Sequence, residues 1–328
     1  MKFWSLIIAS FLVTGAVSAQ QFGGFPPSTK WKQIDSDTAR IIYTEGAAQQ
    51  ANRIATLIHK MAADTFLNLG SRLKKINVVL QNRTTLANGY VALAPFRSEY
   101  FLVPGSNVFD FGNLPWYENL AIHEYRHVQQ YNNFYNGLTK AFYYLFGESG
   151  QALANALTVP DWFFEGDAVH AETALTTQGR GRLPLFLSGY NSLWLEGKNY
   201  NWMKLRNGSL KHYVPSHYHL GYLLSNYGYQ QYGKNFWQQV TQDASAFKGL
   251  FYPFQKAVQK HSGVDYKTFR RNAFDFYKKQ LGEEKTEAEK NKTVTNYYFP
   301  QAVSADSLIY LKTAYNKLPA FYFKNTTT

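Results

Sequence analysis

The residues with the clearest potential for chemistry are His123, Glu124 and His127, which lie in the sequence His-Glu-Tyr-Arg-His. Residues four apart lie on one face of a helix, so the two imidazoles can bind the same metal ion. Glu124 follows the first histidine, where its carboxylate can contact a water molecule on that ion. Two neutral imidazoles with an adjacent carboxylate that is not a ligand are typical of zinc hydrolases with a glutamate base.

The residues around this motif predict that it lies inside a helix. Pro115 suits a first helical turn, and Trp116, Leu120 and Ile122 recur at roughly helical spacing. No glycine or proline interrupts the chain from Trp116 to Tyr135. The alternative is a surface helix whose histidine, glutamate and arginine side chains face solvent.

A third ligand is expected, because catalytic zinc sites usually have three protein ligands. Residues 160–172 predict a second helix, and Glu165 within it is the expected ligand. Gly166 and Ala168 are small, which lets two helices approach closely around the ion. Glu172 lies two turns further along the same face. Its carboxylate is expected to accept a hydrogen bond from a ligand histidine and so to orient the ring.

Taken together, the motif and the downstream pattern Trp-x-x-Glu-Gly-x-Ala-x-x-x-Glu, which starts at Trp162, resemble the gluzincin zinc metallopeptidases, especially their aminopeptidase-like branch. The resemblance implies a single Zn²⁺ bound by His123, His127 and Glu165. It also implies that Glu124 is the general base. The 37 residues between His127 and Glu165 form a longer gap than in the aminopeptidases.

Substrate binding departs from the aminopeptidase pattern as well. The Gly-Ala-Met-Glu-Asn strand, which binds a free amino terminus in those enzymes, is missing. Asn88, Gly89 and Tyr90 begin a segment, residues 88–95, at the place where gluzincins keep an active-site edge strand. An exposed edge can pair with an extended peptide through its backbone. The alternative is an ordinary hairpin strand, and endopeptidase and exopeptidase action both remain open.

The resemblance further implies a tyrosine or histidine, from a later helix, that stabilises the tetrahedral oxyanion. Tyr218 is the expected donor, with His219 and His217 as further candidates; the alternative is a tyrosine of the core. The turn that contains Arg180 and Arg182 is expected to line the cleft and to bind a substrate carboxylate through a guanidinium fork. The alternative for that turn is a solvated loop.

The hydrophobic pattern predicts an α+β fold, with a strand-rich lobe followed by a helical lobe and the metal-binding helix between them. The gluzincin resemblance implies the same architecture. Strands are expected at residues 39–43, 75–81, 90–93 and 99–103, and helices at residues 45–69, 135–157, 217–241 and 264–282.

The two ends of the chain differ from this middle part. Residues 1–19 have the pattern of a signal peptide, with cleavage expected after Ala19; a retained anchor is the alternative. The catalytic domain is expected over residues 20–282 and a charged linker over residues 283–295. Residues 296–328 resemble the start of a TolB-like β-propeller in a chain that we expect to be truncated. The alternative is a short β-appendage on the catalytic domain.

Composition limits the partners. The net charge is +12, but the basic residues are scattered among acidic ones, so nucleic acid is not an expected partner. The chain has no cysteine, which excludes disulfides and thiolate ligands. We expect an exported protein, periplasmic or extracellular, that acts on peptides or proteins and has no stable membrane insertion once the signal is cleaved. The competing hypothesis is a peptidase-like binding or scaffold protein of the cell envelope. The oligomeric state is not predicted.

Overall fold

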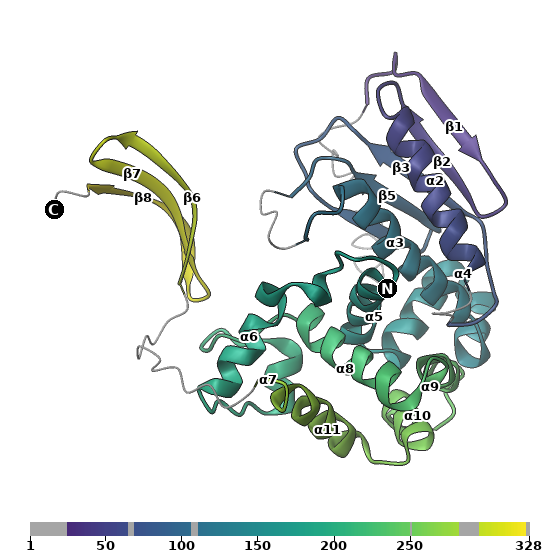
Figure 1. Ribbon diagram of the computed structural model, residues 1–328. Coiled ribbons are helices and arrows are strands. Elements are labelled where there is room, and N and C mark those ends of the chain that lie inside the picture. Colours follow the sequence, from purple (N-terminus) through teal and green to yellow (C-terminus); the bar gives the residue numbers. More distant parts are fainter. Residues whose placement is uncertain (1–24, 65–68, 106–110, 250, 282–294, 326–328) are drawn as a thin grey trace, which may run out of the picture.

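The computed structural model describes residues 25–64, 69–105, 111–249, 251–281 and 295–325 (Figure 1). It has an α+β fold in which a five-stranded sheet is followed by a run of helices and then by a separate three-stranded sheet. The predicted signal peptide and residues 283–294 of the predicted linker lie outside the described residues. Within the described ranges, no helix combines the length and the apolar character that crossing a membrane requires.

The first sheet is mixed, with strand order β1-β2-β3-β5-β4. Strands β2, β3 and β5 are parallel, and the edge strands β1 and β4 are antiparallel to their neighbours. In β3, alternate residues are fully buried, as a half-covered sheet requires. The strands are β1 (Trp31–Asp35), β2 (Ala39–Thr44), β3 (Ile76–Gln81), β4 (Gly89–Ala92) and β5 (Arg97–Phe101).

The helices α2 (Ala48–Ala63) and α3 (Trp116–Asn133) pack on this sheet and share its hydrophobic core. The helix expected over residues 45–69 ends at residue 63, because Asp64 has an extended backbone. Helix α3 begins directly after Pro115, and Glu118 in its first turn interacts favourably with the helix dipole. Almost the whole middle of α3 is buried, because the sheet covers one side and the later helices cover another.

The helical part follows α3 and has its own core of aromatic residues, including Trp162, Phe163 and Trp237. Three of its helices, α6, α7 and α10, and strand β1 of the sheet were not predicted from the sequence. The helices are α4 (Gly137–Thr158), α5 (Asp161–Leu175), α6 (Pro184–Leu195), α7 (Trp202–Asn207), α8 (His217–Tyr232), α9 (Phe236–Ser245), α10 (Pro253–Ser262) and α11 (Tyr266–Lys278), with a 3-10 turn at Arg180–Arg182.

Helices α5 and α8 cross at two glycines. A Cβ atom added to Gly166 would lie 2.0 Å from the carbonyl carbon of Gly221, and one added to Gly221 would lie 1.8 Å from the carbonyl oxygen of Trp162. Only glycine permits this backbone contact. From the sequence, Gly166 is expected to let two helices approach closely around the metal ion. Instead, Gly166 brings α5 against α8, the helix that carries Tyr218.

The C-terminal part forms an antiparallel sheet in the order β6-β7-β8, in agreement with the strands predicted there. The strands are β6 (Thr295–Ser304), β7 (Ser307–Ala314) and β8 (Lys317–Asn325). Tyr315 donates a hydrogen bond to the carbonyl oxygen of Lys211 at 3.0 Å. Strand β8 leaves Leu318, Phe321 and Phe323 exposed to solvent.

Candidate metal centre

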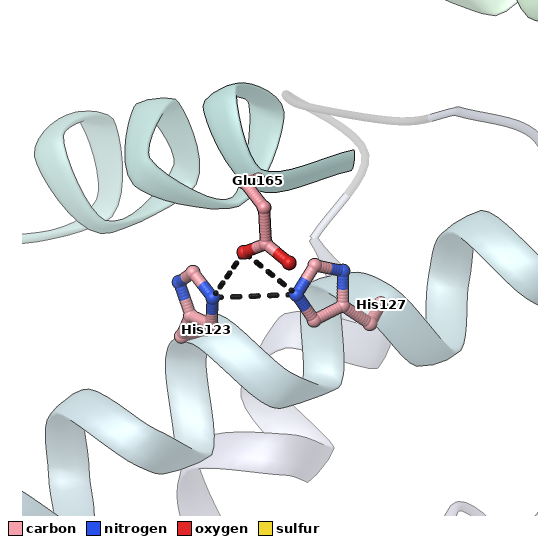
Figure 2. A group of neighbouring side chains, drawn as sticks. All are labelled: His123, His127 and Glu165. Carbon is pink, nitrogen blue, oxygen red and sulfur yellow. Dashed lines mark hydrogen bonds and ion pairs between the residues drawn. The ribbon is translucent and has the colours of Figure 1, made fainter. Parts of the chain in front are cut away.

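Two helices bring three donor atoms together. His123 and His127 lie one turn apart on α3, and Glu165 projects toward them from the first turns of α5 (Figure 2). The two Nε2 atoms are 3.3 Å apart, and Glu165 Oε2 lies 3.2 Å from His123 Nε2 and 3.5 Å from His127 Nε2. Ligand atoms about 2.0–2.1 Å from a tetrahedral zinc ion lie about 3.3–3.4 Å apart. The three donors therefore fit one metal ion.

His123 is oriented by Glu172, as the sequence predicted. Its Nδ1 lies 2.6 Å from Glu172 Oε1, and Glu172 is fully buried. A carboxylate accepts only, so His123 donates from Nδ1 to Glu172, and Nε2 is the atom that a metal would take. Arg180 Nη2 also lies 2.9 Å from His123 Nδ1. Arg180 holds the carboxylate from the other side, through Nε to Oε2 at 2.9 Å.

His127 is oriented by Gln130, which the sequence analysis missed. The ring Nδ1 lies 2.8 Å from Gln130 Oε1. The Nε2 group of Gln130 donates to the carbonyl oxygen of Phe164 at 3.0 Å and to Asp167 Oδ2 at 2.8 Å. Because both of these partners are acceptors, the amide nitrogen must face them and the amide oxygen must face the ring. His127 therefore donates from Nδ1, and Nε2 is the atom that a metal would take.

Asp167 is the centre of a buried network behind His127. It accepts hydrogen bonds from Arg126 Nε at 2.7 Å, Arg126 Nη2 at 3.0 Å and the Tyr229 hydroxyl at 2.8 Å, besides that from Gln130. Burial opposes its ionisation, but the charge of Arg126 holds the pKa of Asp167 below its usual value. The signals for this network lay within the two motifs, since Arg126 precedes His127 and Asp167 follows Glu165 by two residues.

In the metal-free protein, the pKa values of His123 and Glu165 are shifted in opposite directions. Burial lowers the pKa of His123, but hydrogen bonds with Glu165 and Glu172 outweigh this effect and raise it to about 10. Burial likewise opposes ionisation of Glu165, yet the charge of His127 and the hydrogen bond with His123 hold its pKa well below the usual range. A metal ion that binds here must therefore displace a proton from a histidine, so metal affinity depends on pH.

Glu124 lies beside the ligands with a different character. It is buried, and burial raises its pKa. Within the described ranges, no hydrogen bond is made by its carboxylate. Strand β4 packs directly on Glu124. A Cβ atom added to Gly89 would lie only 2.9 Å from Glu124 Oε1 and 2.7 Å from Leu120 Cδ2. The carboxylate is thus free to exchange a proton with a molecule in the pocket.

A pocket of about 360 Å³ opens over the metal ligands. Gly89, Tyr90 and Val91 of β4 line it, which places the predicted edge strand at the site. The Asn88 carbonyl oxygen accepts a hydrogen bond from the Phe101 amide at 2.9 Å, which makes these two residues a hydrogen-bonded pair. By the antiparallel alternation, the N–H and C=O groups of Gly89 and Val91 then point away from β5.

Other pocket-lining residues come from α3, α4, α5 and α8. They are His123, Glu124, His127 and Tyr131 of α3, Ala152, Asn155 and Ala156 of α4, Asp161, Phe164 and Glu165 of α5, and His217 and Tyr218 of α8. The pocket therefore joins the edge of the sheet to the helical part.

Among the oxyanion candidates, Tyr218 and His217 line this pocket. The Tyr218 ring stacks near His123, with centroids 6.2 Å apart. Burial, followed by the charge of Glu165, raises the pKa of Tyr218, so its hydroxyl stays protonated. His219 lines a different cavity, where its ring stacks on Phe186 at 4.3 Å and burial lowers its pKa to about 4.

The two arginines expected to bind a substrate carboxylate have other partners. Arg180 directs Nε and Nη2 at Glu172 and lies 5.2 Å from the centre of the Tyr218 ring. Arg182 donates from Nε and Nη2 to the carbonyl oxygen of Thr173 and from Nε to that of Thr176, at the end of α5. Both guanidinium groups use their fork within the protein: Arg180 supports a metal ligand, and Arg182 caps a helix.

The chain matches no protein-family model, and no curated protein matches it. What is established for the site therefore comes from its own geometry. His123, His127 and Glu165 form a mostly buried donor set that can hold a metal ion. Each histidine has a hydrogen-bond partner at Nδ1 and turns Nε2 toward the other donors, and a carboxylate without hydrogen-bond partners in the described chain stands beside them.

Proposed function

We propose that this chain is an exported, zinc-dependent peptidase of the gluzincin type. The observation that carries the proposal is the triangle of His123, His127 and Glu165 donors beside the buried carboxylate of Glu124. A structural zinc site is normally closed by four protein ligands and needs no base. Two histidines, one carboxylate and an adjacent acid are the set that a hydrolytic zinc site uses.

The site residues divide the work of hydrolysis between them. Zinc, when bound by the three ligands, supplies a Lewis acid that lowers the pKa of a water molecule and polarises the scissile carbonyl. Glu124 takes a proton from the attacking water and delivers it to the leaving amine. Its raised pKa favours this transfer, because the burial that disfavours its charge makes it a stronger base. The Tyr218 hydroxyl donates a hydrogen bond to the oxyanion.

Strand β4 supports a peptide as the substrate. The N–H and C=O groups of Gly89 and Val91 face away from β5 at the edge of the sheet, where an extended peptide can pair with them. Such pairing is independent of side chains, so it would hold the scissile bond over the ligands for many sequences. Pairing through the strand edge requires a stretch of extended chain on at least one side of the scissile bond.

We also propose that β6, β7 and β8 belong to a β-propeller. Blades of propellers are antiparallel sheets, and their faces are covered by neighbouring blades. The exposed Leu318, Phe321 and Phe323 support this assignment, since a covering sheet would bury them. The catalytic proposal does not depend on it.

A peptide-library digest tests the peptidase proposal. The purified protein is expected to cleave peptides when loaded with zinc, to lose that activity with a chelator and to recover it on zinc addition. Glu124→Gln, which keeps the ligands, serves as the matched inactive control. If the zinc-loaded protein binds peptides without cleaving any of them, the protein is a peptidase-like binding module instead.

A further inference from the structure

Asn155 is a buried amide in the pocket wall whose polar atoms have no partner. It lies near the C-terminal end of α4, is 1 % exposed and lines the pocket over the metal ligands. In the described part of the chain, neither its Nδ2 nor its Oδ1 has a hydrogen-bond partner. Among the described residues of this pocket wall, it is the one whose polar side-chain atoms are both unpartnered and inaccessible to solvent.

Three other buried amides do have partners. Gln130 Nε2 donates to Asp167, Gln151 Nε2 donates to the carbonyl oxygen of Tyr131, and Asn226 Nδ2 donates to the Tyr277 hydroxyl. A buried amide without partners lowers stability, and asparagine is also a poor residue for a helix interior. A structural role does not explain Asn155, because an apolar residue of the same size would stabilise α4 better.

The surroundings of Asn155 leave room for a ligand. Ala152, on the preceding turn of α4, and Ala156, which follows Asn155, line the same pocket. Their side chains are small. Asp161 lines the pocket too and begins α5. Asn155 therefore lies in the wall formed by α4 between two small residues, with donor and acceptor atoms that the described chain leaves unpartnered.

A peptide paired with β4 needs such a group. In an extended chain, successive residues turn their N–H and C=O groups to opposite sides, so only alternate residues can bond to β4. The intervening residues carry a donor and an acceptor into the pocket, away from that strand. An asparagine side chain offers the complementary acceptor and donor.

We propose that Asn155 binds the backbone of a peptide substrate on the side that does not pair with β4. The inference rests on the proposed peptide substrate, and it makes Asn155 a substrate-binding residue that lies outside both sequence motifs. It also predicts that recognition at this point is independent of substrate side chains, because both hydrogen bonds go to backbone groups.

The test replaces Asn155 with leucine, which has nearly the same shape and no polar atoms. KM for a cleaved peptide is expected to rise about 20- to 30-fold with little change in kcat, since each of the two hydrogen bonds lost costs roughly a factor of five. The thermal unfolding midpoint is expected to stay the same or to rise, because unpartnered polar atoms leave the interior. Both results together identify a ligand-binding residue.

Asn226→Leu is the matched control. The same substitution there removes the hydrogen bond to Tyr277, outside the pocket. Its unfolding midpoint is expected to fall while KM stays unchanged. If Asn155→Leu behaves like this control, with lower stability and the KM of the wild type, the inference is overturned and the peptidase proposal still stands.

Binding without turnover separates the two proposals. A random library of peptides about ten residues long is bound to Glu124→Gln and to the double variant Glu124→Gln/Asn155→Leu. Weaker retention by the double variant supports the role of Asn155 even if the wild type cleaves nothing. Equal retention by both variants overturns that role, as does a failure of the library to bind either of them.

Discussion

On the side of the metal ligands away from the pocket, Glu172 and Gln130 have hydrogen-bond partners, whereas on the pocket side the carboxylate of Glu124 and the amide of Asn155 have none within the described chain. The side behind holds His123 through Glu172 and His127 through Gln130. Such a closed network fixes ring orientation before a metal binds. The pocket side keeps free the two groups to which we assign proton transfer and substrate binding. The difference predicts that changes behind the ligands affect stability and metal affinity, and that changes in the pocket affect turnover.

The largest effect is expected for Glu124→Gln, on the pocket side. Loss of the general base is expected to lower kcat by about two to four orders of magnitude. Stability is expected to stay unchanged or to increase, because a desolvated acid is replaced by a neutral amide. Steady-state kinetics, zinc content and thermal melting measure the three quantities. A variant that keeps wild-type kcat would remove Glu124 from its assigned role.

Behind the ligands, Arg126→Met is expected to destabilise the protein most. The substitution leaves Asp167 as a buried charge without its main counter-ion, which typically costs about 3–5 kcal/mol. Denaturant unfolding measures the change. The control is Arg53→Met, which breaks an exposed pair with Glu118 and is expected to have little effect. Equal stability of the two variants would contradict a structural role for the buried pair.

The contribution to stability of Glu172, which holds the His123 ring, is expected to depend on pH. Burial raises the pKa of Glu172, but the charge of Arg180 and the hydrogen bonds from His123 and Arg180 lower it to about 2, from 4.5. A depressed folded-state pKa stabilises the protein above pH 4.5, and this contribution is lost as the pH falls toward 2. In the metal-free protein it amounts to about 3 kcal/mol. The free energy of unfolding of the wild type should fall more steeply over this pH interval than that of Glu172→Gln. The same pH dependence in both proteins would disprove the assignment.

The smallest effect is expected when Gln130, which holds the His127 ring, is replaced. Gln130→Leu removes the acceptor that fixes the tautomer, and loss of such a partner typically costs 10- to 100-fold in metal affinity, about 1–3 kcal/mol. Competition with a chromophoric chelator measures the zinc affinity. Gln151→Leu, which removes a buried amide bonded to the Tyr131 backbone, is the control and should keep wild-type affinity. Equal affinities for both variants would mean that Gln130 does not act on the metal site.

The sequence contained enough information for the ligands but not for their supports. Helical spacing alone joins His123 to His127, and the helix that starts after Pro160 carries Glu165 to them, so these residues were predicted. Gln130 and Asp167 were missed because a hydrogen-bonded network between two helices depends on how the helices pack, which local patterns do not encode.

For Arg180, the sequence suggested the wrong partner. Its charge and its position in a turn suggested a substrate carboxylate, but the buried Glu172 is a closer partner. Asn155 carried no signal at all, because its significance lies in the partners that it lacks. In the fold, the strongly alternating strands were predicted well, whereas short helices such as α7 and α10 were stabilised by tertiary packing and were missed.

A zinc titration of the metal-free protein, followed by peptide cleavage, tests the central claim most directly. The account predicts no cleavage without metal and a linear rise in activity that stops at one zinc ion per chain, with His123→Ala inactive throughout. Cleavage that persists in the metal-free protein, or zinc bound with full stoichiometry by His123→Ala, would contradict the claim that His123, His127 and Glu165 form the hydrolytic centre.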